Sequence, residues 1–185
     1  MSFFNDYLNA VELPLLKSMH DALECDFLDA VMPVISNLCK WGVLWIAIAA
    51  ILLCFRKTRR VGVTVALALI IGFAVGNGIL KPLFARIRPY NIDTALNIII
   101  PKEKDFSFPS GHALASVESA FSIFIHDKKW GTAALVVALL IAFSRVYLMM
   151  HFFTDVIAGV LLGILFAIAA YYIGRYVIKR TKMPV

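Results

Sequence analysis

Two histidines, a carboxylate and several cations recur at short spacings in three fragments of this chain. In chain order these fragments are Lys81-x6-Arg88-Pro89, Pro109-Ser110-Gly111-His112, and Ser144-Arg145-x5-His151-x3-Asp155. Each fragment falls at the end of a long apolar stretch, so the three can meet at one surface of a membrane protein. Imidazoles beside permanent cations suit the binding of a phosphate group and its displacement from whatever carries it.

The third fragment supplies a candidate nucleophile, provided that residues 144–155 form one helix. Asp155 then lies one turn beyond His151 on the same face and can accept a hydrogen bond from the imidazole Nδ1–H. That bond leaves Nε2 unprotonated for attack on phosphorus. A single histidine at a helix end is more often an interfacial residue. With Asp155 and Arg145 beside it in an apolar segment, we predict that His151 is catalytic, because intramembrane ionisable groups tend to be functional.

The second fragment supplies a candidate anion cradle and acid. Ser110 and Gly111 lie where a helix would begin, so we expect their backbone N–H groups to be unpaired and able to bind an anion. Gly111 also permits close approach of a phosphate. His112 is placed to protonate a leaving oxygen as general acid. The alternative is an ordinary serine N-cap.

The first fragment supplies positive charge. Lys81 and Arg88 would share one face of a helix, and together with Arg145 they would bind phosphate oxygens and neutralise a five-coordinate transition state. The alternative is a collar of basic side chains that extend to the membrane interface. We assign Arg86, which lies off the motif face, to such a collar.

The composition indicates a membrane protein. Of 185 residues, 61% are hydrophobic and only 16% are charged, against about a quarter charged in a soluble domain. Runs long enough to cross the hydrocarbon core predict five spans, near 34–55, 61–80, 112–126, 131–150 and 156–175. The expected fold is a single-domain, all-α integral membrane bundle over residues 1–185, with about five to six transmembrane helices. Residues 3–23 predict an additional amphipathic helix, which either lies in the membrane interface or packs on the bundle.

The net charge of +6 does not indicate nucleic-acid binding, because the basic residues are distributed by side. Three segments at alternate span ends are basic, and their residues are Arg56, Lys57, Arg59 and Arg60, then Lys128 and Lys129, then Arg175, Lys179, Arg180 and Lys182. The positive-inside rule places these segments and the C-terminus in the cytoplasm. The three chemical fragments then face the outside.

Several other residues carry expectations. Cys25, Cys39 and Cys54 lack the spacing of a metal site. Cys25 and Cys39 could form a disulfide, but we predict that both are buried thiols. Glu118, in the span 112–126, is predicted to pair with a serine of its own span. Gly159 and Gly163 are expected to let two helices pack closely. The N-terminus lacks the pattern of a cleavable signal peptide, and no metal or other cofactor is expected.

Together the three fragments resemble the three-part signature of the type-2 phosphatidic acid phosphatase family, which shares its site with vanadium haloperoxidases. The likeness covers residues 81–155 in the correct order, and the surrounding spans fit the compact bacterial members of the family. The resemblance implies metal-independent removal of phosphate from lipids through a phosphohistidine, at the outer face of a bacterial plasma membrane. His151 would be the nucleophile, Asp155 its orienting partner, and His112 the acid and later the base that activates water. The phosphate-binding residues would be Lys81, Arg88, Ser110, Gly111 and Arg145.

The resemblance leaves the substrate open among undecaprenyl diphosphate, phosphatidylglycerol phosphate, phosphatidic acid and a lipid A phosphate, with the first two favoured on family grounds. A lipid phosphotransferase using the same phosphohistidine is an alternative. A non-catalytic lipid-binding relative is another, although such a protein would have no need of both histidines. A transporter would show paired repeats, and the sequence shows none. The partners expected are therefore a lipid phosphate and the bilayer, and nothing in the sequence indicates an oligomeric state.

Overall fold

The computed structural model describes residues 2–181, in which every regular element is helical. The elements are α1 (Ser2–Leu23), α2 (Asp26–Leu38), η1 (Lys40–Gly42), α3 (Val43–Cys54), α4 (Arg59–Gly72), the π-helix η2 (Phe73–Leu80), α5 (Lys81–Phe84), α6 (Pro89–Ile92), α7 (Gly111–His126), α8 (Lys128–Tyr147) and α9 (Phe153–Thr181). The all-helical prediction is confirmed for this part of the chain.

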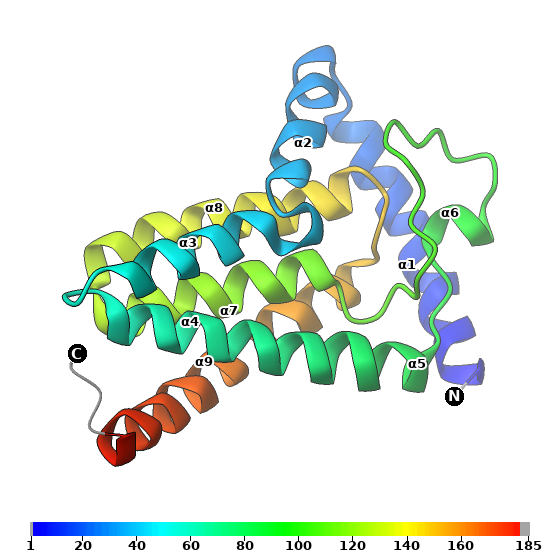
Figure 1. Cartoon of the computed structure of the whole chain (residues 1–185). Coiled ribbons are helices and arrows are strands. Elements are labelled where there is room, and N and C mark those ends of the chain that lie inside the picture. The colour runs from blue at the N-terminus through cyan, green and yellow to red at the C-terminus, as the bar shows by residue number, and fades with distance from the viewer. Residues whose placement is uncertain (1, 182–185) are drawn as a thin grey trace.

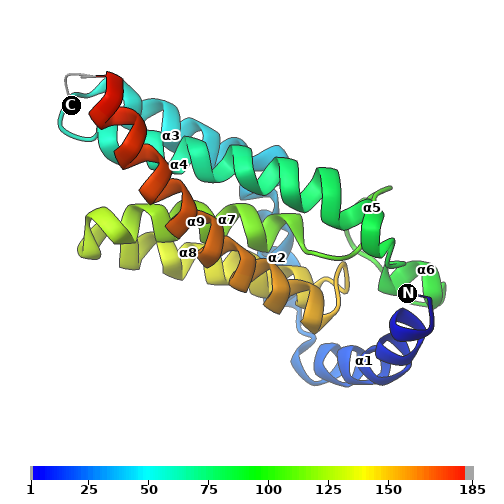
Figure 2. The ribbon, with the colours of Figure 1, turned by 90° about the horizontal axis from the view of Figure 1, so that it is seen from below.

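Helix α7 lies at the centre of the bundle, packed against α4, α8 and α9. Helices α3, α4, α7 and α8 lie with their axes roughly aligned, and α9 crosses the bundle on one face (Figures 1 and 2). Helix α1 lies across one end of the bundle, beside the long loop that joins α6 to α7 (Figure 1). This central position of α7 places its first residues, including His112, among segments from both halves of the chain.

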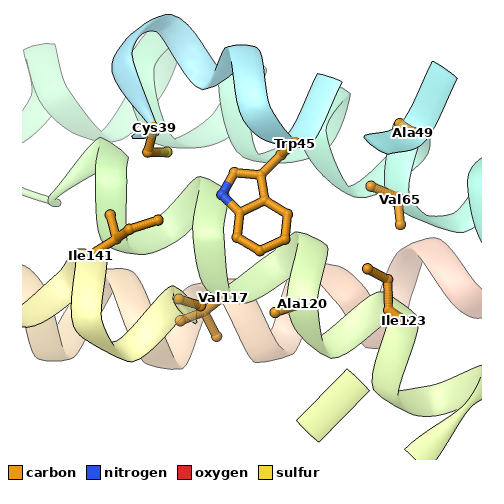
Figure 3. Close-up of a cluster of buried hydrophobic side chains, with 9 residues drawn as sticks. Cys39, Trp45, Ala49, Val65, Val117, Ala120, Ile123 and Ile141 are labelled. Carbon is orange, nitrogen blue, oxygen red and sulfur yellow. The ribbon is translucent and has the colours of Figure 1, made fainter. Parts of the chain in front are cut away.

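The largest apolar core lies between α3, α4, α7 and α8. Trp45 projects from α3 toward α7 among small and branched side chains (Figure 3), and its indole N–H donates a hydrogen bond of 3.0 Å to Ser116 Oγ. Cys39 is buried beside it, as predicted. The prediction is wrong for Cys25, which is exposed because it lies in the turn before α2.

The two ends of the bundle differ in charge. The α3–α4 turn, the α7–α8 turn and the C-terminal end of α9 lie at one end, and α1 and the α6–α7 loop lie at the other (Figure 1). The basic segments of residues 56–60, 128–129 and 175–180 therefore gather at one end. This agrees with the predicted alternation of span directions.

Fewer helices than predicted are long enough by themselves to cross a membrane. Among the described residues, three stretches are both long and apolar enough: Arg59–Ile92, Lys128–Tyr147 and Phe153–Lys179. The first of them runs from α4 through η2 and α5 to α6, and the other two are α8 and most of α9. A fourth span requires α2 and α3 to act together across a bend of 40°. The predicted continuous span 34–55 is wrong, because Trp41 and Gly42 adopt positive φ angles of 57° and 70° and interrupt the helix. Helix α7, at 16 residues, is shorter than a full span.

Helix α1 buries two polar side chains on the same side as the apolar Leu16, while several of its apolar side chains are exposed. Tyr7, Val11 and Leu15 are exposed, whereas Asn9 and Glu12 are less than one-tenth exposed. In a soluble protein this arrangement would be unfavourable, because the apolar side chains would meet water. Next to lipid the same arrangement buries the apolar side chains in the bilayer and the polar ones in the protein. Both predicted positions for this segment, at the interface and on the bundle, are compatible with it.

Close packing of α9 on α7 yields a stability prediction. A Cβ atom added at Gly163 would lie 3.0 Å from both the Glu118 nitrogen and the Val117 Cβ, which confirms the expected close approach. We expect Gly163→Ala to destabilise the protein by about 1–3 kcal/mol through overpacking. Gly174→Ala, on the same helix, meets ordinary contacts of 3.5 Å or more and serves as the matched control. Thermal unfolding in detergent would measure both, and equal midpoints would contradict the prediction.

Candidate active site

The three fragments do converge, but not through the continuous helices that were predicted. Helix α8 ends at Tyr147 and α9 begins at Phe153, with Met149 between them at a positive φ of 52°. Helix α5 ends before Ala85, whose φ is 45°. Positive φ angles cost free energy in residues other than glycine and are concentrated at functional sites. The two turns, rather than helical faces, aim the side chains of these fragments.

His151 is fully buried, and both of its ring nitrogens have neighbours. Nδ1 lies 2.8 Å from the main-chain oxygen of Ser107 and 3.7 Å from Asp155 Oδ2. Nε2 lies 3.2 Å from Arg88 Nη1, a donor. These contacts fit the predicted tautomer, with the proton on Nδ1 and the lone pair on Nε2. The predicted direct hydrogen bond to Asp155 is replaced by one to Ser107, because the intervening turn moves the carboxylate out of reach.

Asp155 accepts three hydrogen bonds at the start of α9. Its donors are Ser107 Oγ at 2.5 Å, the Phe152 main-chain N–H at 2.9 Å, and Arg86 Nη1 at 2.7 Å. The bond from Phe152 is of the kind that an acidic residue makes back to a helix N-cap. The assignment of Arg86 to an exposed collar is wrong: only 1% of the residue is exposed. The turn at Ala85 directs Arg86 inward, where carboxylates compensate its charge.

The three predicted phosphate-binding cations gather around two carboxylates of the α6–α7 loop. Arg88 Nη2 lies 2.6 Å from both Glu103 Oε2 and Asp105 Oδ1. Arg145 Nη2 lies 2.7 Å from Glu103 Oε1, and Lys81 pairs with Asp105. Arg88 and Arg145 are each only 1% exposed. Carboxylate oxygens thus already pair with all three of the cations that were predicted to bind phosphate.

Both loop carboxylates are held in the ionised form. Burial alone would raise the pKa of Glu103, but the charges of Arg145 and Arg88 lower it to about 2. The pKa of Asp105 is likewise lowered to about 2, because contacts with Lys81 and Arg88 outweigh its burial. A depressed pKa stabilises the folded state above the pKa of the unfolded chain. The stabilisation by these pairs is therefore complete above about pH 5 and is lost as the pH falls toward 2.

The second fragment begins α7 next to these cations. The N–H of Ser110 donates 3.0 Å to the Asp155 main-chain oxygen, so the prediction that it is unpaired is wrong. The Ser110 hydroxyl, by contrast, is buried without a partner among the described residues. A Cβ atom at Gly111 would lie 3.9 Å from Lys81 Nζ, which places this backbone beside the cations. His112 is the second residue of α7 and is partly buried, and its main-chain oxygen lies 3.8 Å from Cys39 Sγ.

Glu118 lies deeper in α7 and does not belong to this cluster. Its Oε2 is buried and has no partner among the described residues. The predicted pairing with a serine side chain is wrong, because Ser122 Oγ donates instead to the main-chain oxygen of Glu118, at 2.7 Å. The carboxyl group packs against Gly72, where any larger residue would collide with it.

Sequence reasoning missed four residues of the site: Ser107, Glu103, Asp105 and Glu12. The first three lie in a loop without periodicity, where no pattern separates a contact from a solvated side chain. Glu12 lies in a segment that was predicted only as an amphipathic helix. The apolar face of this helix could have revealed the burial of Glu12. Such a face can contact lipid as readily as a protein core, and if it contacts lipid, the polar face meets the protein.

Comparison with known proteins shows which family this chain resembles. Residues 57–179 match the model of the PAP2 superfamily. An undecaprenyl-diphosphatase of Sulfolobus acidocaldarius is 37% identical over 68% of this chain, but the match spans only 62% of that protein's length. Two crystal structures are similar. LpxE of Aquifex aeolicus has a TM-score of 0.76 at 25% identity, over 86% of this chain and 94% of its own.

The second structure is the first transmembrane PAP2 type phosphatidylglycerolphosphate phosphatase from Bacillus subtilis. It has a TM-score of 0.71 at 26% identity, over 92% of this chain and 87% of its own. The matched residues 57–179 contain all three fragments and helices α4 to α8 complete. Because this family match covers more than half of the chain and the two crystal structures share its fold, this chain belongs to the PAP2 superfamily.

Proposed function

We propose that this protein is an integral-membrane lipid phosphatase that removes phosphate from a lipid phosphate or diphosphate through a phosphohistidine on His151. The single observation that carries the proposal is the contact of 3.2 Å between His151 Nε2 and Arg88 Nη1. In this contact, the imidazole nitrogen that we propose as the nucleophile lies at the edge of a cluster of cations. A phosphate held by those cations would present its phosphorus atom to that nitrogen.

The proposed reaction has two steps. In the first, Nε2 of His151 attacks phosphorus, the N–P bond forms, and the P–O bond to the lipid breaks. His112 gives its proton to the departing oxygen. In the second, His112 takes a proton from water, the water oxygen bonds to phosphorus, and the N–P bond breaks to release inorganic phosphate. The Ser107 carbonyl and the nearby Asp155 carboxylate stabilise the positive charge on the imidazole.

The cations would stabilise the charge that develops on the phosphoryl oxygens. Arg88 and Arg145 present planar forks that suit two oxygens each, whereas Lys81 acts as a point charge. The unpartnered hydroxyl of Ser110 and the backbone of Gly111 complete the cradle. Because Glu103 and Asp105 already pair with these cations, a phosphate must displace them to bind.

This displacement predicts an effect of Asp105→Asn on inhibition by inorganic phosphate. Removing the competing charge from Lys81 and Arg88 leaves them free to bind phosphate. We expect inhibition to strengthen by about threefold to fivefold, a modest effect because the Asp105 side chain is half exposed and its pairs are screened. Asp93→Asn is the matched control, because Asp93 lies in the same loop as Asp105 but pairs with Lys17 of α1 and not with the cations of the site. Weaker inhibition of the Asp105 variant would contradict the prediction.

The membrane placement is also a proposal. Five spans, with α2–α3 as a bent span and α7 as a short one, would put the site at the outer face of a bacterial plasma membrane and the C-terminus in the cytoplasm. The exposed apolar row of α1 would rest in the outer interface. All of residues 1–185 would form one domain.

Labelling of single cysteines on intact cells tests this topology. In protein freed of its native cysteines, an impermeant thiol reagent should label Asn97→Cys, on the outside, and should not label Lys129→Cys, in the cytoplasm. The reverse labelling would overturn this topology.

The activity is tested by phosphate release from four lipids: undecaprenyl diphosphate, phosphatidylglycerol phosphate, phosphatidic acid and a lipid A phosphate. We favour the first two. The protein would be purified in detergent and assayed with EDTA, beside His151→Ala. Release that survives EDTA and is lost in the variant would support the metal-independent histidine mechanism. If no phosphate were released from any of the four lipids, the hydrolase proposal would be overturned. Phosphotransfer would then be tested by repeating the assay with a lipid or sugar acceptor present.

A further inference from the structure

A buried polar network joins α1 to the candidate active site. Arg86 is at its centre and uses both terminal nitrogens: Nη1 lies 2.7 Å from Asp155 Oδ1, and Nη2 lies 2.6 Å from Glu12 Oε2. Its Nε donates to Asn9 Oδ1 at 2.9 Å, and its guanidinium stacks over the Phe152 ring at 4.1 Å. One cation thus bridges the carboxylate nearest His151 and a carboxylate on the N-terminal helix.

Glu12 makes a second connection to the same place. Its Oε1 accepts the main-chain N–H of Thr154 at 2.9 Å, and its Oε2 accepts the Thr154 hydroxyl at 2.7 Å. Thr154 Oγ1 in turn accepts from Arg86 Nη1 at 2.6 Å. The N–H of Thr154 lies in the first turn of α9, where no helical partner exists and a carboxylate is favoured. Glu12 therefore holds both the start of α9 and the cation that binds Asp155.

We propose that Glu12 is a positioning residue for the reaction, acting through Thr154 and Arg86 on the carboxylate of Asp155. The inference rests on the proposed function of His151. It assigns to α1, which lies outside the three fragments, a part in the chemistry. Glu12 lies too far along this chain of contacts to touch the phosphate, so its effect should fall on the chemical step and not on binding.

The alternative is that Glu12 only fastens α1 to the bundle. A second attachment of α1 allows the two roles to be separated. Lys17 Nζ lies 2.9 Å from Asp93 Oδ2, an exposed pair between α1 and the α6–α7 loop that reaches neither Arg86 nor Asp155. Loss of that pair loosens the attachment of α1 without changing the network. Lys17→Gln is therefore the matched control for Glu12→Gln.

Glu12→Gln keeps the size of the side chain but removes its charge, so Arg86 and the start of α9 lose their anchor. We expect kcat for lipid phosphate to fall by about 10- to 100-fold, the range typical of residues that orient a catalytic group, with KM within about twofold. Lys17→Gln should retain kcat within about twofold, because an exposed pair contributes little. A kcat for Glu12→Gln equal to that of Lys17→Gln would overturn the proposal.

A double-mutant cycle gives a readout that mere attachment would not change. If Glu12 acts through Asp155, Glu12→Gln should cost almost nothing more once Asp155→Asn is present, because the carboxylate it positions is gone. An equal loss in both backgrounds would show that Glu12 serves only the attachment of α1. Radiolabelled lipid would make the low rates of the Asp155 variant measurable. Absence of activity in the unmodified protein would instead reject the proposed function itself.

Glu12→Gln could lose its fold, and a pair of substitutions at Thr154 covers that outcome. Thr154→Val removes the hydroxyl that links Glu12 to Arg86 at nearly constant volume, whereas Thr154→Ser keeps it. We expect kcat to fall by about threefold to tenfold in the valine variant, an effect of one or two buried hydrogen bonds, and to stay near the original value in the serine variant. Equal rates for the two variants would overturn the network as the route of action.

Discussion

His151→Ala is expected to lower the rate of phosphate release by about a thousandfold or more, because removal of a covalent nucleophile eliminates the main reaction path. The imidazole is fully buried and is held by Ser107 and Arg88, so no other described side chain can replace it at that position. Alkaline quenching during turnover of a radiolabelled lipid should trap phosphohistidine in the unmodified protein and none in the variant.

The matched control for this variant is His126→Ala. His126 lies at the last position of α7, at the opposite end of the bundle, where its Nε2 lies 2.9 Å from Thr64 Oγ1. We expect its activity to stay within about threefold, since the loss of one distant hydrogen bond changes stability and not chemistry. Turnover of His151→Ala at a rate near that of the control, or a trapped phosphohistidine in it, would exclude the proposed nucleophile.

Comparison of the predicted and observed site shows which information lies in local sequence. The residue types of the three fragments predicted that their charged side chains and His151 gather in one place, because the chemistry expected of them needs cations beside an imidazole whatever path the backbone takes. The backbone path was not predictable in the same way. Ala85 and Met149 reverse the chain at positive φ angles, yet neither is a glycine or asparagine, the residues that normally mark such turns. Tertiary packing, and not local preference, holds these two conformations.

Arg86 and Glu12 show a second limit of sequence reasoning. Arg86 was assigned to a basic collar because it is off the motif face. Glu12 belongs to a segment that was predicted only as an amphipathic helix, without a role for its carboxylate. The structure pairs them across 74 positions of sequence, both buried. A pair of opposite charges at such separation leaves no periodic signal. Each charge makes the burial of the other possible, so neither position can be inferred alone.

Helix lengths were predictable only where one helix crosses the whole bundle. The stretches that became α8 and α9 were predicted as single spans and are single helices. The predicted span 112–126 is a helix of 16 residues, and the predicted span 34–55 is two helices joined by a bend. Hydropathy records apolar surroundings, which a short or bent helix in the centre of a bundle also has. Hydropathy therefore identifies the apolar segments of the chain, but it does not show which of them are continuous helices that cross the membrane.

Arg88→Lys is expected to lower kcat/KM by about 10²- to 10³-fold, equivalent to about 3–4 kcal/mol of lost transition-state stabilisation. The substitution keeps the charge but removes the fork. Arg88 uses that fork to contact the Met150 main-chain oxygen at 3.0 Å and His151 Nε2 at 3.2 Å through Nη1. Its Nη2 pairs with Glu103 and Asp105, which the phosphate would displace under the proposed function. A lysine ammonium cannot hold the nucleophile and two phosphoryl oxygens in one plane. Steady-state rates with the preferred lipid would measure the loss.

Arg56→Lys is the matched control for this substitution, since Arg56 is exposed at the other end of the bundle. It makes the same chemical change far from the site, and its kcat/KM should stay within about twofold, as for most exposed substitutions. If Arg88→Lys behaved like this control, charge alone would suffice at position 88 and the fork would have no role. If instead only KM rose, Arg88 would bind phosphate equally in the ground and transition states. A fall in kcat with little change in KM is the result that the contact with His151 predicts, because that contact orients the nucleophile for the chemical step.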